Sequence, residues 1–278
     1  MVKKTVKRKK SRSRKRKTKH KNFKITGKTV FMTILIVLAV SLLAYIYYPL
    51  YSGWFSDAKT EKEHIDSFRQ KLPNYSVFGI DISHNQVKVD WKKVFSEQKI
   101  DFVIIRSTMG NSSSDKNFEK NWKSLKANKA IRGAYHYYRP DEDGKKQAEN
   151  YIKNVKLEQG DLPPIIDIER YSKSKSIKSL KTEILKWLEI VENQYNITPI
   201  IYTYNHFYTK VFLNDSRFEK YPIWLAWYNT SKNPSTLIED WVFWQFSDKC
   251  KIIGIEEDVD IDVFNGRIQD LNGLRLKK

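Results

Sequence analysis

Two acidic residues stand two positions apart in an otherwise apolar stretch, Ile165-Ile166-Asp167-Ile168-Glu169. The apolar residues predict a buried β-strand, whose side chains alternate between the two faces of a sheet. Asp167 and Glu169 would therefore share one face, about 7 Å apart along the backbone. Because burying unpaired carboxylates costs free energy, this placement indicates a functional site.

Paired carboxyl groups are what the hydrolysis of a glycosidic bond requires. One group stays protonated until it gives its proton to the departing sugar, while an ionised group stabilises the cationic transition state. The spacing of Asp167 and Glu169 is therefore typical of chemistry on a carbohydrate. Both an inverting and a retaining course remain open, because spacing along a chain does not give the separation of two carboxyl groups.

The elements that position these acids follow from the alternation of apolar and amphipathic stretches. Residues 148–155 and 177–195 have apolar positions at helical spacing, and Asp90 is expected to cap a short helix that begins at Trp91. Strands that alternate with helices predict an irregular (β/α) TIM-like barrel. The connections between the last predicted strands are short, which predicts that some helices are missing there or that some of these strands are antiparallel. The predicted strands cover residues 77–82, 101–107, 131–138, 164–169, 199–204, 222–227, 241–246 and 259–264.

Acidic residues occupy three of these predicted strands. Asp81 ends the first strand, and Asp260 and Asp262 lie in the last. Asp167 and Glu169 end the fourth. Functional groups of such barrels gather at the carboxyl ends of the strands. A single aspartate could serve as a helix cap or turn residue, but three acidic groups at one rim are better explained by catalysis.

Positive charge is concentrated at the amino end. The chain has 278 residues and a net charge of +19, yet residues 1–28 hold 15 Lys/Arg and no acid. The folded body is thus close to neutral, and we expect residues 1–28 to be a disordered cytoplasmic tail. The tail lacks interleaved aromatic residues, which disfavours nucleic acid as a partner. Anionic lipid headgroups are the partner that it favours.

Residues 29–50 predict a transmembrane signal anchor. The run 29–48 is uncharged and mostly apolar, with the length that a helix needs to cross a bilayer. Positive charge before it keeps the amino terminus in the cytoplasm. We therefore expect a single-pass protein of the cell membrane, with residues 51–76 as a juxtamembrane linker and residues 77–278 as an extracytoplasmic catalytic barrel.

Other chemistries find little support in the sequence. Cys250 is the single cysteine, so no intramolecular disulfide can form. His84 and His136 follow predicted strand ends, but no closely spaced histidine pair indicates a metal site. A glycine-rich phosphate loop and a Gly-x-Ser-x-Gly nucleophile motif are also missing from the sequence. We therefore expect neither a metal nor a cofactor.

Seven short motifs occur in a fixed order between residues 77 and 266. They are Phe78-Gly79-Ile80-Asp81-Ile82-Ser83-His84-Asn85-Gln86 with Val89-Asp90-Trp91, Gly133-Ala134-Tyr135-His136-Tyr137, Asp167-x-Glu169, Ile201-Tyr202-Thr203, Trp224-Leu225-Ala226-Trp227-Tyr228, Trp244-Gln245-Phe246 and Val259-Asp260-Ile261-Asp262-Val263-Phe264. Each motif is weak alone, but seven in order are specific. Together they resemble glycoside hydrolase family 25, the Chalaropsis-type lysozymes.

The resemblance implies an N-acetylmuramidase that cleaves the β-1,4 bond between N-acetylmuramic acid and N-acetylglucosamine in peptidoglycan, without a cofactor. It implies Glu169 as general acid and Asp167 as the group that stabilises the intermediate. Asp81 and Asp260 match two further acids of the cleft. Attack by the substrate's own acetamido group, positioned by Asp167, would be retaining. Attack by water activated by Asp167 or Asp81 would be inverting.

Several residues near predicted strand ends are candidates for binding the sugar rings. Aromatic rings and hydroxyl groups suit a partly apolar carbohydrate cleft, although packing within the barrel would explain the same residues. We expect five residues to contact substrate: Tyr135, Tyr137, Tyr202, Trp227 and Gln245.

Two positions depart from the pattern of the family. Met109 stands where a glutamate is usual, in Arg106-Ser107-Thr108-Met109-Gly110, and Asp262 stands where an asparagine is usual. Met109 favours a second hypothesis, a peptidoglycan-binding module with weakened catalysis. The acids of the cleft, all retained, favour the enzyme.

Overall fold

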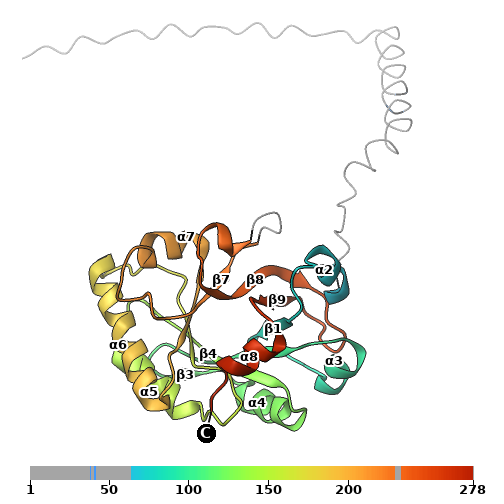
Figure 1. Cartoon of the computed structure of the whole chain (residues 1–278), viewed down its shortest axis with the longest axis horizontal. Helices are drawn as coiled ribbons and strands as arrows, with labels where there is room; N and C mark the ends of the chain where they lie inside the picture. The colour runs from blue at the N-terminus through green and yellow to red at the C-terminus, as the bar shows by residue number, and fades with distance from the viewer. Residues whose placement is uncertain (1–37, 39–40, 42–63, 229–232, 278) are drawn as a thin grey trace, which may run out of the picture. The chain divides into compact units, whose positions relative to one another are not determined.

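Eight strands close into a barrel in the part of the chain that the structure describes (Figure 1). The structure is a computed structural model that describes residues 38, 41, 64–228 and 233–277. The chain divides into two units, Met1–Thr60 and Glu61–Lys278, and the named elements belong to the second. The barrel strands are β1 (Phe78–Ile82), β2 (Phe102–Met109), β4 (Ile131–Tyr137), β5 (Ile165–Asp167), β6 (Ile200–Tyr204), β7 (Ile223–Ala226), β8 (Trp241–Cys250) and β9 (Val259–Phe264).

The order of the strands confirms the predicted barrel. Neighbours from β1 through β2, β4, β5, β6 and β7 to β8 are parallel. The short strand β3 (Ser113–Ser114) forms an antiparallel pair with the end of β2. Strand β9 closes the barrel between β8 and β1, and it runs antiparallel to both.

The direction of β9 changes how its acids reach the rim. We expected every acid near the carboxyl end of its strand, but Asp260 is the second residue of β9. It lies opposite Asp81 only because β9 runs the other way. Asp262 lies opposite Gly79, one layer deeper in the barrel. A reversed strand therefore presents its first residues at the rim where parallel strands end.

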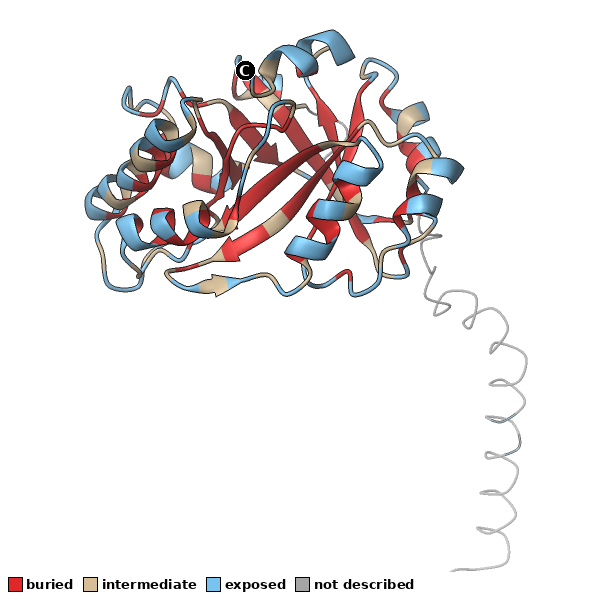
Figure 2. Cartoon of the chain, turned by 90° about the horizontal axis from the view of Figure 1, so that it is seen from below, coloured by how far each residue is buried: buried red, intermediate tan, exposed pale blue. Residues whose placement is uncertain are grey.

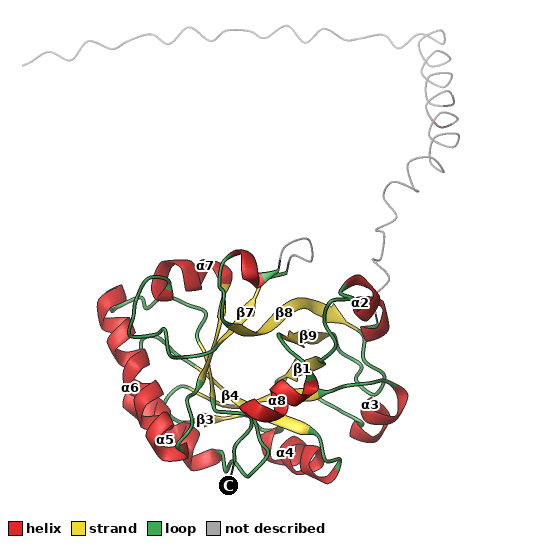
Figure 3. Cartoon of the chain, viewed as in Figure 1, coloured by secondary structure: helices red, strands yellow, loops and turns green. Residues whose placement is uncertain are grey.

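Helices surround the barrel and present their buried faces to it (Figures 2 and 3). Asp90 caps α3 as predicted, since its side chain accepts a hydrogen bond from the Lys93 amide. Leu271 of the last helix packs into the barrel interior with residues of the strands. The helices are α3 (Trp91–Glu97), α4 (Phe118–Ala127), α5 (Gly144–Asn154), α6 (Ile177–Tyr195), α7 (Asn205–Phe207), a π-helical turn (Tyr208–Phe212), a 3-10 turn (Pro234–Thr236) and α8 (Ile268–Leu274).

Two apolar layers hold the fold together. The layer inside the barrel includes Phe102 and Phe243, and the layer between strands and helices includes Ile166 and Trp187. A Cβ atom at Gly79 would overlap the Phe102 ring, so glycine at this position leaves room for that ring inside the barrel. Alternation along each strand sends successive side chains into the two layers in turn.

The end of the expected linker belongs to the folded body. Helix α2 (Ile65–Lys71) buries Ile65 and Phe68, and the Phe68 ring meets that of Phe246 at 5.3 Å between centroids. Arg69 donates to Asp101 at 3.3 Å. The catalytic body therefore begins about a dozen residues before residue 77, because apolar residues of α2 complete the outer layer.

The predicted membrane anchor lies outside the described residues, apart from residues 38 and 41. Among the residues that are described, helices long and apolar enough to span a bilayer do not occur. The anchor and the tail before it remain predictions from the sequence.

Candidate active site

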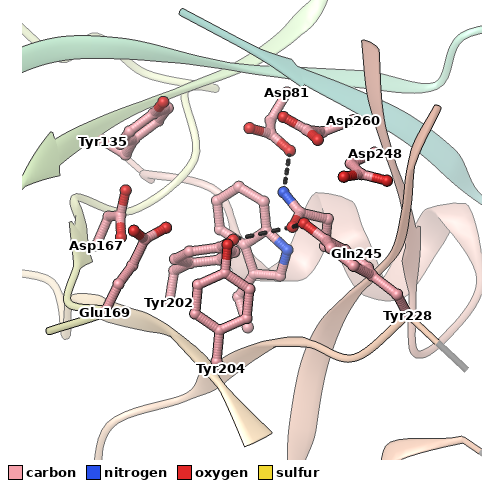
Figure 4. Close-up of a pocket in the computed structure, with 11 residues that line it drawn as sticks. Asp81, Tyr135, Asp167, Glu169, Tyr202, Tyr204, Tyr228, Gln245, Asp248 and Asp260 are labelled. Atoms are coloured by element: carbon pink, nitrogen blue, oxygen red, sulfur yellow. Dashed lines mark hydrogen bonds between the residues drawn. The ribbon is translucent and has the colours of Figure 1, made fainter. Parts of the chain in front are cut away.

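A pocket of about 230 Å³ opens at the rim of the barrel where the acids meet (Figure 4). It brings together four of the acids that the sequence singled out, Asp81, Asp167, Glu169 and Asp260. The other residues that line it are Tyr135, Tyr202, Tyr204, Trp224, Tyr228, Gln245 and Asp248.

The Asp167–Glu169 pair forms one wall of the pocket (Figure 4). Strand β5 ends at Asp167, two residues earlier than we expected, but the alternation continues to Glu169. The Ile168 amide donates to the Tyr202 carbonyl at 3.0 Å, and Thr203 Oγ1 donates to the Ile168 carbonyl at 2.7 Å. These bonds hold the Ile168 side chain in the outer apolar layer, so its two acidic neighbours point inward.

The two acids of the pair have different surroundings. Asp167 is 5% exposed, and its Oδ1 has no hydrogen-bond partner among the described residues. Burial raises the pKa of Asp167 well above its usual value, and the charge of Glu169 raises it further. Burial also raises the pKa of Glu169, while Arg170 and a hydrogen bond with Tyr137 oppose that rise. Glu169 is therefore a partly accessible acid that stays protonated at higher pH than a solvated glutamate.

Asp81 and Asp260 lie on the other side of the pocket (Figure 4). Burial and then the charges of Asp81 and Asp248 raise the pKa of Asp260 to about 9. Burial raises the pKa of Asp81 well above its usual value, and the charge of Asp262 adds to the rise. Burial, and after it mutual repulsion, therefore favours neutral carboxyl groups in this pocket.

Asp262 lies beneath these acids and is fully buried. Its Oδ1 accepts a hydrogen bond from Trp224 Nε1 at 2.8 Å. Its Oδ2 has no hydrogen-bond partner among the described residues, and its charge raises the pKa of Asp81. The asparagine that is usual here would carry no charge, so Asp262 makes the protonation of Asp81 depend on a second acid.

Gln245 connects the pocket wall to two tyrosines. Its Nε2 donates to Asp81 Oδ2 at 2.7 Å, and its Oε1 accepts from Tyr202 at 2.9 Å and from Tyr228 at 2.7 Å. We expected Gln245 to contact substrate, and it does line the pocket. Its hydrogen bonds, however, are made to the protein and fix the orientation of Asp81.

The expected aromatic residues divide into three groups. Tyr135 and Tyr202 line the pocket as expected. Tyr137 lies in the neighbouring groove, where it hydrogen-bonds Glu169. Trp227, the fifth expected residue, lies elsewhere. Its side chain packs against the outer apolar layer, and it does not line the acid pocket. The alternation of β7 brings Trp224 into the pocket in its place.

Four pocket residues were missed as site residues. Tyr204 is two positions after Tyr202, and Tyr228 is four positions after Trp224, so the same alternation would have found all of these aromatics. Asp248 gave no such signal. The β8–β9 pairing slips between Gln245 and Ser247, and this bulge brings Asp248 to the pocket wall.

The two histidines lie beside other side chains of the protein. His136 is fully buried between Thr108 and Gln147, and burial lowers its pKa to about 4. His84 lies beside Arg106 at the edge of a second groove. Within the described residues, groups of three or more ligands with metal-binding geometry are not found.

A closed α/β barrel with paired, partly protonated carboxyl groups and tyrosines at one rim is the architecture of an enzyme that hydrolyses carbohydrate. Residues 80–255 match the profile of glycosyl hydrolases family 25. The match covers more than half of the chain, and the protein therefore belongs to glycosyl hydrolases family 25.

Individual relatives agree with this assignment. The uncharacterized protein YegX of Escherichia coli strain CFT073 is 32% identical over 264 residues, 90% of this chain and 96% of its own. A family 25 glycosyl hydrolase from Bacillus anthracis superposes with a TM-score of 0.66 at 28% identity, over 73% of this chain and 95% of its own. The bacterial lysozyme from Streptomyces coelicolor superposes with a TM-score of 0.66 at 29% identity, over 72% of this chain and 97% of its own.

Proposed function

We propose that this protein is a lysozyme that hydrolyses the β-1,4 bond between N-acetylmuramic acid and N-acetylglucosamine in peptidoglycan. The observation that carries the proposal is the Asp167–Glu169 pair, held side by side in a pocket that raises the pKa of both. Membership of family 25 and the likeness to the lysozyme of Streptomyces coelicolor support the choice of substrate.

Glu169 is the general acid in this proposal. Its proton passes to the glycosidic oxygen, the bond from that oxygen to the anomeric carbon breaks, and the electron pair of the bond stays with the departing sugar. Burial favours the protonated form of Glu169, and its partial exposure lets it reach the substrate. Tyr137 fixes the orientation of the carboxyl group through its hydrogen bond.

Asp167 stabilises the positive charge at the anomeric carbon. In the course that we propose, the acetamido oxygen of the substrate attacks that carbon, and Asp167 accepts a hydrogen bond from the acetamido N–H. The unpartnered Oδ1 of Asp167 is available for this bond. Water then opens the ring intermediate with net retention. Proton NMR of the first-formed product distinguishes retention from inversion, in which water would attack directly.

Replacing Glu169 tests the proposal. Glu169→Gln keeps the shape of the side chain but removes the proton, so release of new reducing ends from purified peptidoglycan should fall by roughly a hundredfold or more. Glu219→Gln is the matched control, because Glu219 is exposed and remote from the acid pocket. Unchanged hydrolysis by a folded Glu169→Gln protein would exclude Glu169 as the acid.

The alternative of a binding module with weakened catalysis rested on Met109. This residue lines the neighbouring groove and is not among the residues of the acid pocket. Its exchange for the usual glutamate therefore leaves the Asp167–Glu169 pair complete, and the enzyme is the better supported function.

We also propose that residues 29–50 anchor the enzyme in the cell membrane, with residues 1–28 in the cytoplasm and the barrel outside. The uncharged run and the basic segment before it support this topology. Protease added to intact spheroplasts should remove the barrel and leave an amino-terminal tag protected. Recovery of the full chain in the aqueous fraction after cell lysis would contradict the anchor.

A further inference from the structure

A second groove, here called the cationic groove, adjoins the acid pocket. It has a volume of about 690 Å³, against about 230 Å³ for the pocket, and Glu169 lines both. It is therefore an extension of the active site beyond the catalytic acid. The cationic groove is lined by His84, Arg106, Met109, Tyr137, Arg139, Pro140, Asp141, Glu142, Glu169, Arg170, Tyr171 and Lys173.

Two of the four strong cations of this groove are committed to neighbours. Arg106 forms an ion pair with Asp115 at 3.1 Å, and Arg139 forms one with Glu142 at 3.1 Å. By contrast, the side chains of Arg170 and Lys173 form no ion pair with any acid in the described part of the chain. Both residues are exposed. Their charges are available to a ligand.

The four strong cations of the groove outnumber its three acids, Asp141, Glu142 and Glu169, and two of these acids already accept hydrogen bonds from the protein. Asp141 Oδ1 accepts bonds from the hydroxyl groups of Ser172 and Ser174 and from the Lys173 amide. These bonds lower the pKa of Asp141 to about 2. Glu142 accepts from the Asn111 amide as well as from its arginine. These acids hold the loops that carry the cations.

Met109 removes a further negative charge from the groove. Where the family usually has a glutamate, the Met109 sulfur lies 3.5 Å from Arg139 Nη2. A thioether offers the guanidinium only a weak contact, so Arg139 keeps donors for an external anion. Tyr171, 40% exposed, adds an aromatic surface beside the cations.

We propose that the cationic groove binds the carboxylates of the peptide carried by the muramic acid residue that is cleaved. This inference rests on the proposed function. In peptidoglycan, the lactyl group of each muramic acid bears a short peptide with free carboxylates and small apolar side chains. A muramic acid placed with its glycosidic oxygen at Glu169 would direct this peptide out of the pocket, and the adjoining groove has the size, charge and apolar wall to hold it.

Three glycan substrates free of phosphate test the proposal: chains with intact peptides, the same chains with all carboxyl groups amidated, and chains stripped of peptide by an amidase. The wild-type protein should cleave the intact chains with a kcat/KM roughly tenfold above that for the other two, the effect of about one charge-assisted hydrogen bond. The difference should lie in KM. The amidase leaves a free lactyl carboxylate on the stripped chains, so these chains separate the effect of that carboxylate from the effect of the peptide.

The double variant Arg139→Gln/Lys173→Gln should reduce the preference to within about twofold while stripped chains are cleaved as before. Arg170 is left in place, because its charge acts on Glu169. Lys92→Gln/Lys120→Gln, which removes two exposed charges outside the groove, should keep the preference.

Different failures have different meanings. Equal cleavage of intact and amidated chains, or a preference that survives in the Arg139→Gln/Lys173→Gln protein, would overturn the peptide site and leave the lysozyme assignment intact. A preference that appears only when phosphate-linked polymers remain on the chains would overturn it in favour of those polymers. Failure of the wild-type protein to cleave all three substrates would overturn the proposed function itself.

Discussion

Asp81 and Asp260 lie directly opposite each other across an antiparallel pair of strands, β1 and β9, in a barrel whose other neighbouring strands are parallel except at β8–β9. Both carboxyl groups face the pocket that holds Asp167 and Glu169. Each acid raises the pKa of others, so the site as a whole holds more protons than the same acids would in water.

Tyr137 controls the pH range of activity. Tyr137→Phe removes a hydrogen bond that lowers the pKa of Glu169, so this pKa should rise. A general acid works only when protonated, and the alkaline fall in activity should therefore move to higher pH. The pH profile of kcat/KM measures the shift.

Tyr138→Phe is the control for this prediction. It removes a neighbouring buried hydroxyl group that has no hydrogen-bond partner among the described residues. In the pH profile of kcat/KM, the alkaline fall of the Tyr138→Phe protein should coincide with that of the wild-type protein. A Tyr137→Phe limb that stays in place or moves to lower pH would show that this hydroxyl group does not act on the acid.

Asp262→Asn should stabilise the protein at alkaline pH. The pKa of buried Asp262 is raised well above its usual value by burial, so the folded state binds a proton that the unfolded state has released. Stability from such a group is present below about pH 4 and is lost as pH rises through the folded pKa. Asparagine removes this loss, and its amide can donate to Asp81 while its oxygen still accepts from Trp224.

Urea unfolding at pH 5 and pH 8 measures this effect. At pH 8 the Asp262→Asn protein should be more stable than the wild-type protein, because asparagine has no proton to lose. The difference should shrink at pH 5. Asp240→Asn, at an exposed aspartate, should show no such pH dependence. Equal effects of Asp262→Asn at both pH values would contradict the raised pKa of Asp262.

Gln245 is expected to be as important for stability as for activity. Gln245→Leu leaves Asp81, Tyr202 and Tyr228 without their buried partner. The free energy of unfolding should fall by about 2 kcal/mol, and kcat should fall because Asp81 loses its orientation. The exposed Gln70→Leu control should change stability by less than about 0.5 kcal/mol. Wild-type stability and kcat in Gln245→Leu would exclude this role.

Trp224 in β7 and Trp227 just after it should differ in their effect on catalysis when each is replaced by phenylalanine. Trp224→Phe removes the indole N–H that donates to Asp262 and part of the pocket wall, so kcat/KM should fall roughly tenfold. Trp227→Phe should change KM by less than about twofold, because that side chain packs outside the pocket. Steady-state kinetics of both variants on the same glycan measures these effects. A larger loss of kcat/KM in Trp227→Phe than in Trp224→Phe would show that Trp227, and not Trp224, belongs to the pocket.

Much of the site could be predicted because successive side chains of a β-strand point to opposite faces of the sheet. Ile165, Ile166 and Ile168 indicated a buried strand, and period-two alternation then placed Asp167 and Glu169 on one face. The same rule, applied to residues 224–228, would have chosen Trp224 over Trp227. The barrel itself followed from eight apolar stretches separated by helical ones, and its closure through β1 and β2 confirmed it.

The sequence by itself determined which residues are acidic, which stretches are strands and which side chains share a face, since these depend on neighbours along the chain. Only the tertiary structure decided that β9 runs backwards and brings Asp260 to the rim. It also decided that a bulge after Gln245 brings Asp248 into the pocket. Strand direction and register arise from contacts between residues far apart in the chain, and local patterns do not record those contacts.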